Sequence, residues 1–213
     1  MIKRMNPEER KVLLLKQSRA LFFEHGYEQV RVDDILSASG ISKGGFYHHF
    51  ESKDDVLRLL IEQEIEQLTS EIAKSTNTDP IGALVSLFQL GSHFLDASDG
   101  IVMALNAPAT KAFYINTVEQ SLDQHLKPAL RDIIERGCEA ETFNRVDPDN
   151  TAELIMAVNN HANRNSILHG WSDAKVSAFS GTGITLLGTL LGITSQLAII
   201  VDQLNINSKE QPS

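Results

Sequence analysis

The hydrophobic and polar positions follow a helical period along almost the whole chain. Asn6 and Pro7 are typical of a helix start, and Gly26 is typical of the end of that first helix. No stretch alternates apolar and polar residues as a half-buried strand does. The pattern therefore predicts an all-α protein. Helices are expected over 7–25, 31–39, 43–50, 52–74, 80–96, 100–106, 109–138, 149–169 and 173–204.

The last of these stretches has two interpretations. From Val176 to Val201 the chain carries no charge over 26 residues, which is long enough to span a bilayer. Gly188 and Gly192 form a G-x-x-x-G pattern, which is common in membrane helix pairs. The many Ser, Thr, Gly and Gln residues and the absence of flanking basic clusters argue against a membrane-associated interaction protein.

The second interpretation is a helix that pairs two subunits. Leu186, Leu190, Ile193 and Leu197 recur at spacings of four and three, as in a coiled-coil seam. Small residues on the other side of the helix would allow close approach of a neighbouring backbone. We expect this homodimer rather than a membrane span. The predicted dimer interface consists of Ile184, Leu187, Gly188, Leu190, Leu191, Gly192, Ile193 and Leu197.

Charge is unevenly distributed along the 213 residues. The net charge is −9, yet residues 1–55 hold nine basic and nine acidic residues, so the whole excess of acid follows residue 55. A neutral head on an acidic body can turn its basic positions toward a polyanion. The single cysteine, Cys138, excludes an internal disulfide and is typical of a reducing compartment. Without an apolar leader at the start, the chain is expected to be cytoplasmic.

The stretch "DDILSASGISKGGFYHHF" has the proportions of a helix-turn-helix, with Gly40 at the turn. Its second helix leaves polar and small residues on the outside, where Lys, Tyr and His can donate to DNA and glycine allows close approach. Any one of these residues could simply lie on a solvated face. Lys53, in the first turn of the next helix, could share a phosphate with free backbone N–H groups. It could equally be an exposed lysine balanced by Asp54 and Asp55.

Residues 10–60, and in particular "LFFEHGYEQVRVDDILSASGISKGGFYHHFESKDDVL", resemble the DNA-binding head of the TetR (tetracycline-repressor-like) transcriptional regulators. The resemblance implies a homodimer whose third helix enters the major groove, with phosphate contacts from Tyr47 and Lys53. Many family members carry Thr where this chain has Gly45, and Thr or Ser where it has Arg31, which leaves the operator sequence open. The DNA-binding residues expected are Arg31, Ser42, Lys43, Gly44, Gly45, Tyr47, His48, His49 and Lys53.

The expected domains are a helix-turn-helix domain over 1–51, an effector-binding and dimerisation domain over 52–205, and a polar tail over 206–213. The resemblance implies a repressor that binds a palindromic operator and is released by a small-molecule effector. The candidate effector pocket consists of Phe88, His93, Phe94, Met103, Asn106, Phe113, Tyr114, His125, Asn159 and Asn163. Its aromatic residues could equally be plain core, and the Asn-rich stretch could lie at an interface. No spacing of His, Cys or acidic residues predicts a metal, a cofactor or a catalytic site, so we do not expect an enzyme.

Overall fold

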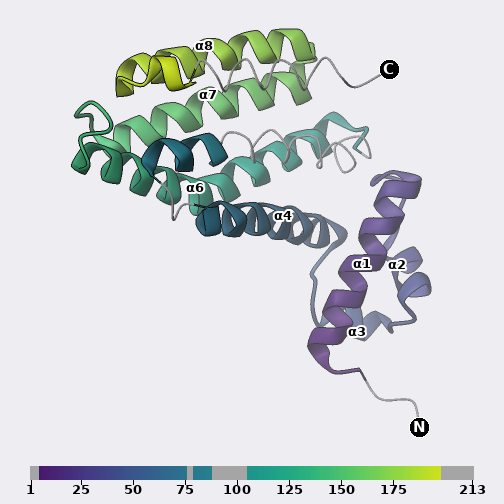
Figure 1. Cartoon of the computed structure of the whole chain (residues 1–213). Coiled ribbons are helices and arrows are strands. Elements are labelled where there is room, and N and C mark those ends of the chain that lie inside the picture. The colour runs from purple at the N-terminus through teal and green to yellow at the C-terminus, as the bar shows by residue number, and fades with distance from the viewer. Residues whose placement is uncertain (1–4, 76–78, 88–104, 198–213) are drawn as a thin grey trace. The chain divides into compact units, whose positions relative to one another are not determined.

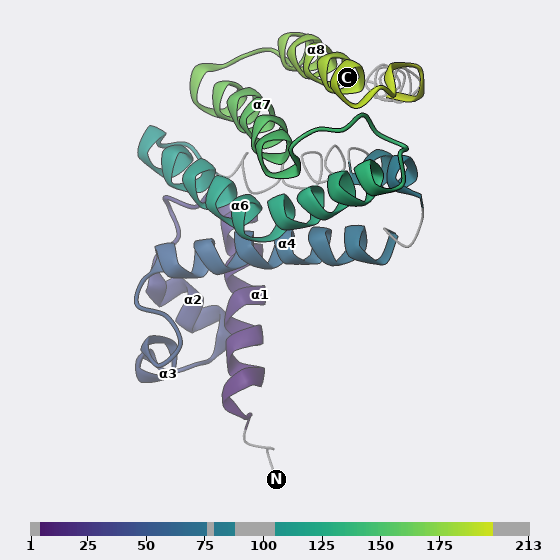
Figure 2. The same ribbon diagram turned by 90° about the vertical axis from the view of Figure 1, so that its left-hand side faces the viewer.

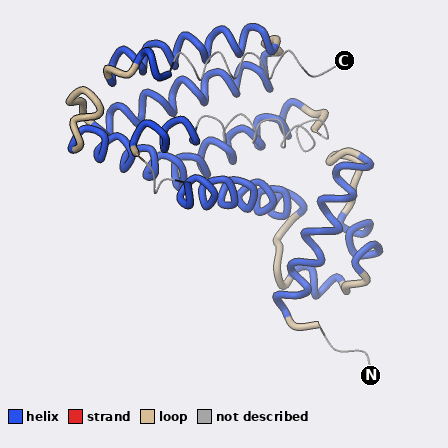
Figure 3. The backbone as a smooth tube through the Cα atoms, in the orientation of Figure 1, coloured by secondary structure: helices blue, strands red, loops and turns tan. Residues whose placement is uncertain are grey.

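The computed structural model describes residues 5–75, 79–87 and 105–197, and every regular element in these ranges is helical (Figure 3). The protein is all-α, as its periodicity predicts. Residues 80–87 are also helical, with Asp79 capping their first turn. The helices shown in Figure 1 are α1 (Pro7–His25), α2 (Val32–Ser39), α3 (Lys43–Tyr47), α4 (Lys53–Ser75), α6 (Pro108–Glu139), α7 (Pro148–His169) and α8 (Asp173–Leu191).

The chain divides into two compact units. One consists of Met1–Glu64 with Ser98–Thr117, and the other of Ile65–Ala97 with Val118–Ser213. Both α4 and α6 therefore begin in the first unit and continue into the second. The first unit extends beyond the 1–51 range expected for the DNA-binding domain.

Helices α1, α2 and α3, here called the head, pack around one small core. The first helix starts as its sequence predicts, because Asn6 and Glu9 cap each other's backbone N–H groups at 2.8 Å. The α2 helix lacks a short capping side chain at Arg31, and Asp34 instead accepts the Arg31 N–H at 2.7 Å. The buried residues of the head include Leu14, Leu15, Phe22, Val30, Ile35, Ile41, Phe46 and Phe50.

In the second unit α6 and α7 run antiparallel. Their register is set by Arg164–Glu119 at one end and by Arg131–Asp149 at the other, the latter joined at 2.8 Å. Helix α8 lies beside α7 in both views (Figures 1 and 2). Where they meet, a Cβ at Gly183 would lie 2.7 Å from Val158, so only glycine allows this close approach.

The expectation of one continuous last helix is wrong. Helix α8 ends at Leu191, and Gly192 follows in the left-handed conformation at φ 76°. The Ile193 N–H donates back to the Gly188 carbonyl at 2.8 Å, which closes a glycine C-cap. Asn144 then binds the last carbonyls of α8, with its backbone N–H 2.8 Å from Leu191 O and its side-chain amide 3.1 Å from Leu190 O.

Two other expectations concern this part of the chain. Residues 105 and 106 precede α6 without helical structure, so the predicted 100–106 helix does not reach its expected end, and 100–104 lie outside the described residues. Within the described ranges, no helix combines the length and the hydropathy that a bilayer crossing requires.

Candidate nucleic-acid interface

The turn between α2 and α3 fixes the geometry of the site. Gly40 adopts a left-handed conformation at φ 65°, and its N–H donates to Leu36 O at 2.9 Å, so the chain leaves α2 sharply. Ser42 then caps α3 by accepting the Gly45 N–H at 3.2 Å. The hydroxyl proton of Ser42 remains available to a further acceptor. Two short helices joined by this turn form a helix-turn-helix.

Helix α3 has one buried and one exposed face. Phe46 is completely buried, and Ile41 and Phe50 on either side of α3 are 7% and 2% exposed. These three apolar side chains anchor the short helix to the head. Opposite them, Tyr47 is 49% exposed, and Lys43, Gly44 and His48 are exposed. The exposed face carries donors suited to phosphates and base edges.

The two glycines of α3 serve different purposes. A Cβ at Gly44 would meet nothing within 4 Å, so this glycine leaves open space on the exposed face. At Gly45 a Cβ would lie 2.8 Å from Cγ2 of Ile41. Gly45 therefore also lets α3 pack against Ile41, while its close approach to DNA remains a prediction.

His49 lies at the edge of this face and is half-buried, with its Nε2 atom covered and without a hydrogen-bond partner in the described part of the chain. Burial lowers the pKa of His49, and the positive charges of His48, Arg10 and Lys11 lower it further, while Glu8 opposes them. His49 therefore takes up a proton less readily than a free imidazole.

Lys53 has partners that the sequence did not reveal. Its ammonium donates to the carbonyls of Tyr27 at 2.7 Å and Val30 at 2.8 Å, and lies 4.1 Å from the centre of the Tyr27 ring. Burial lowers the pKa of Lys53, while Asp54 and Glu28 oppose this shift. The Tyr27 hydroxyl donates to Asp54, which completes a clamp between the α1–α2 loop and the start of α4. The phosphate contact of Lys53 remains a prediction, now beside an internal role.

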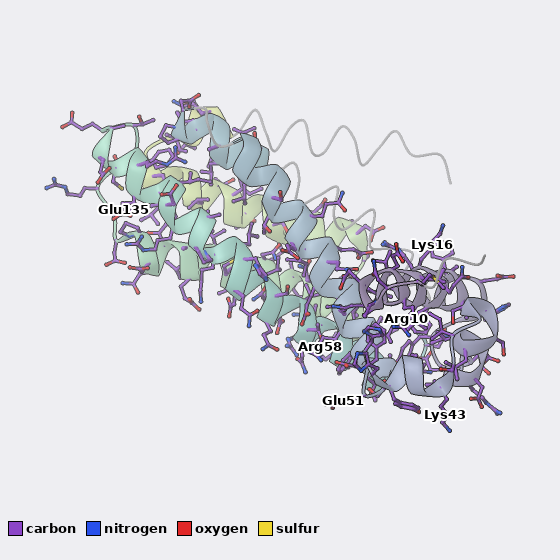
Figure 4. The ribbon with its side chains drawn as sticks, turned by 90° about the horizontal axis from the view of Figure 1, so that it is seen from below. Arg10, Lys16, Lys43, Glu51, Arg58 and Glu135 are labelled. Atoms are coloured by element: carbon purple, nitrogen blue, oxygen red, sulfur yellow. The ribbon has the colours of Figure 1, made fainter. Side chains whose placement is uncertain are left out.

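Several cations of the head have no carboxylate partner among the described residues. Arg19 pairs with Glu64, and Arg58 pairs with Asp55, so these two are neutralised locally. Figure 4 labels two of the unpaired cations on α1 and one at the start of α3. The unpaired cations of the head are Arg10, Lys11, Lys16, Arg31 and Lys43. The sequence places Arg10, Lys11 and Lys16 close together on α1. They precede the helix-turn-helix stretch, so that motif does not point to them.

Comparison with known proteins decides the family. The family of bacterial regulatory proteins named tetR matches residues 14–60. The TetC protein of transposon Tn10 from Escherichia coli is 36% identical over 84 residues, which cover 39% of this chain and only 41% of TetC. The HTH-type transcriptional regulator YwcC of Bacillus subtilis, itself uncharacterized, is 30% identical over 159 residues, 65% of this chain and 67% of YwcC. The chain belongs to the TetR family.

A solved structure of a further protein agrees with this fold. RolR in complex with resorcinol aligns with a TM-score of 0.63 over 97% of both chains at 20% sequence identity. TetR-family proteins are DNA-binding transcriptional regulators. That α3 enters the major groove remains a prediction.

The expected effector residues are scattered. Phe88, His93, Phe94 and Met103 lie outside the described residues. Tyr114 and Asn163 are buried, whereas Phe113 and Asn159 are half-buried. Asn106 precedes α6 and is exposed, and His125 is exposed as well, which removes the reason for placing either in an enclosed pocket. An open hollow of about 750 Å³ lies on the head instead and is lined by Leu21, His25, Gln29, Val30, Asp34, Ser37 and Ala38.

The expected dimer seam needs correction, because most of its residues are buried within their own chain. Leu191 is completely buried, Ile193 and Leu197 are 1% exposed, and Leu187 and Ile184 are 7% and 8% exposed. Gly188 is also buried, with a Cβ position only 3.0 Å from the backbone of Thr194, and Gly192 forms the C-cap. Of the predicted leucines, Leu190 is the one that stays available, at 42% exposed.

Proposed function

We propose that this TetR-family regulator is a repressor that binds a palindromic operator as a homodimer and is released by a small-molecule effector. The observation that carries the proposal is the exposed face of α3, with Lys43, Tyr47 and His48 pointing away from a core closed by Phe46. Such a face matches the major groove, where side-chain donors read base edges.

The unpaired cations of the head would hold the phosphates. Three of these cations lie on α1, namely Arg10, Lys11 and Lys16. The other two are Arg31 at the start of α2 and Lys43 at the start of α3. Because no carboxylate in the described residues neutralises them, each can release a counterion when it meets a phosphate. Tyr47 would add a hydroxyl donor beside them. This arrangement supports binding to DNA although the whole chain carries a charge of −9.

For the dimer interface we propose the outer face of α7 and α8. Leu154 is 60% exposed and Leu186 is 66% exposed, and Leu190 follows one turn after Leu186. Large apolar residues at this exposure mark an interaction surface when they cluster. The contact between Val158 and Gly183 places Leu154 and Leu186 at the same level of the two antiparallel helices.

An aromatic cluster continues this face toward the α7–α8 turn. His161, Trp171 and Phe179 stack against one another with ring centres 5.2–5.5 Å apart. Lys175 covers the Trp171 ring at 4.0 Å. Pairing this face with its copy in a second subunit would bury the leucines and the rings together.

The effector would bind in the second unit, near α6 and α7. Ser121 Oγ and Asn160 Oδ1 are buried and have no hydrogen-bond partner among the described residues. The register set by Glu119–Arg164 and Lys127–Glu153 puts both residues at the same level of this helix pair. An unpaired buried polar atom costs about 1–3 kcal/mol, so these atoms favour a ligand that supplies a hydroxyl or amide. RolR, which shares the fold, binds the dihydroxy compound resorcinol.

The mechanism is a two-state one. One conformer of the dimer holds its two α3 helices about one DNA turn (~34–36 Å) apart, and the effector favours a conformer with a different spacing. Only a difference in effector affinity between the two conformers can drive this change.

The experiment is selection from a randomised duplex pool at about 0.1 M salt, where non-specific phosphate binding is already weakened. An enriched inverted repeat supports a dimeric helix-turn-helix reader. A reporter gene under that repeat then gives the sign of regulation, with lower expression expected when the protein is present. If a folded dimer enriches no sequence, the proposal fails at the head; if expression rises, the repressor assignment fails.

A further inference from the structure

The loop between α1 and α2, residues 26–31, contacts the start of α6. The Glu28 carboxylate accepts the backbone N–H of Asn106 at 3.0 Å and that of Ala107 at 2.8 Å through the same oxygen, Oε1. These residues are separated by 78 and 79 positions in sequence, and all belong to the first unit. A loop of the DNA-binding head is thus hydrogen-bonded to the beginning of a helix that continues into the second unit.

Glu28 binds the backbone just before the first turn of α6. Ala107 stands where a helix normally has Ser, Thr, Asp or Asn, and its side chain cannot accept a hydrogen bond. The Glu28 carboxylate binds one position earlier, on the N–H groups of Asn106 and Ala107, where its negative charge lies near the positive end of a long helix. Burial alone would raise the pKa of Glu28, but the N–H groups of Ala107, of Glu28 itself and of Asn106, with the Thr110 hydroxyl, bring this pKa below its ordinary value. Glu28 is therefore an anion at neutral pH.

The same loop is fixed to α4. Lys53 donates to the carbonyls of Tyr27 and Val30, which flank Glu28 in sequence. The loop ends at Arg31, the N-cap residue of α2. Both helices that pass from the first unit into the second therefore contact this loop, and its end sets the start of the helix-turn-helix.

We propose that Glu28 is the positioning residue that couples the start of α6 to the DNA-contacting helices. A displacement of α6 along its axis moves the N–H groups of Asn106 and Ala107. Glu28 moves with them while Lys53 holds the loop on α4, so the displacement changes the orientation of α2 and α3. This inference rests on the proposed function, because it assigns the path by which an effector would alter operator binding.

Linkage supplies a test that needs no effector. If the position of α6 changes operator affinity, then operator binding must change the position of α6 by the same coupling. We would measure hydrogen–deuterium exchange of residues 111–117 in full-length protein, with and without the duplex enriched by selection. These amides lie beyond those that Glu28 binds, so the loss of a local cap alone does not remove their response to DNA.

In the wild-type protein, operator should slow exchange of residues 111–117 by about fivefold or more, the lower end of common allosteric coupling. Glu28→Ala should abolish this response to operator. Glu28→Gln, which keeps one acceptor oxygen without the charge, should give an intermediate response and serves if the alanine variant folds poorly. Glu24→Ala is the matched control, because Glu24 is 73% exposed at the end of α1 and its ion pair is with the neighbouring His25.

The outcomes separate the two claims. If wild-type protein enriches no duplex, the proposed function fails and this inference falls with it. If it binds operator but exchange at 111–117 does not change, the coupling is refuted while the DNA-binding function stands. A response of wild-type size in both Glu28→Ala and Glu28→Gln would likewise overturn the role of Glu28.

Discussion

Replacing Lys53 by methionine distinguishes a phosphate contact from an internal clamp. Methionine keeps the aliphatic stem over the Tyr27 ring and removes the charge. The ammonium makes hydrogen bonds of 2.7 and 2.8 Å to two loop carbonyls and lies 4.1 Å from the ring centre. The place of Lys53 in the first turn of α4 and the TetR resemblance both predict that the same ammonium binds DNA.

The magnitude follows from these contacts. A hydrogen bond from a charged group contributes about 1.5–3 kcal/mol, and a partly exposed cation–π contact about 0.5–1 kcal/mol. Burial of the ammonium, which lowers the pKa of Lys53, works against this gain. The two hydrogen bonds and the cation–π contact sum to about 3.5–7 kcal/mol, and the cost of burying the ammonium offsets part of that sum. We therefore expect Lys53→Met to lower the free energy of unfolding by about 2 kcal/mol. For a chain of this size, that is a fall in Tm of about 4–8 °C.

Two assays separate the roles, with Lys43→Met as the matched control. Lys43 is exposed at the start of α3 and has no partner among the described residues. Its replacement should leave the unfolding free energy within about 0.5 kcal/mol of wild type. It should also make the slope of log affinity against log salt shallower by about 0.9 per protomer. Lys53→Met should show the reverse, with lower stability in urea unfolding and an unchanged salt slope. A wild-type Tm together with a shallower slope would refute the clamp and assign Lys53 to a phosphate.

Three further perturbations test other parts of the structure. Leu186→Asp combined with Leu190→Asp should raise the dimer dissociation constant by about a hundredfold or more in sedimentation, because burying each leucine contributes about 1.5–3 kcal/mol. The control is Val12→Asp, at a 55% exposed position on α1. A dimer unaffected by the two leucine changes would place the interface elsewhere. Burial and neighbouring cations lower the pKa of His49, so the folded state takes up this proton less readily than the unfolded chain, and stability should fall as the pH drops below 6.5. In urea unfolding across pH 5–7, the free energy of unfolding should depend less on pH in His49→Gln than in wild type. The same pH dependence in both proteins would contradict this. Gly137→Ala should lower the free energy of unfolding by about 1–3 kcal/mol, because its Cβ would lie 2.0 Å from the Phe143 ring. Gly44→Ala is the control, since a Cβ there meets no neighbour within 4 Å. An equal Tm for the two variants would refute the packing argument.

Local signals in the sequence predicted the helix starts well. Asn6 with Glu9, Ser42, Asp147 and Ser172 each cap a helix in the structure as their residue types favour. These signals are reliable because a cap and the N–H group it binds lie within a few residues of each other. The turn at Gly40 was predictable for the same reason, since it requires a left-handed backbone conformation.

Most of the contacts that the sequence did not predict join distant residues. Glu28 meets Ala107, Lys53 meets Tyr27 and Val30, and Asn144 meets the end of α8. The position of Gly192 could have suggested a C-cap, but the uncharged run around it favoured a continuous helix. Whether a leucine of α8 faces the core or a partner depends on which side of the helix α7 covers, and no local pattern contains that information.

A match to the family motif identifies the architecture of the head more securely than it identifies the residues that touch DNA. Tyr27 and Lys53 belong to the motif, yet here they bind each other and the start of α4. Gly45, at a position where many members carry Thr, is fixed by Ile41. A motif position can thus be explained by packing inside the head, and exposure is the criterion that distinguishes the candidates for DNA contact. By that criterion Lys43 and Tyr47 are the motif residues best placed for DNA, and the exposed Lys16 on α1 should contribute about as much to the salt slope as Lys43 does.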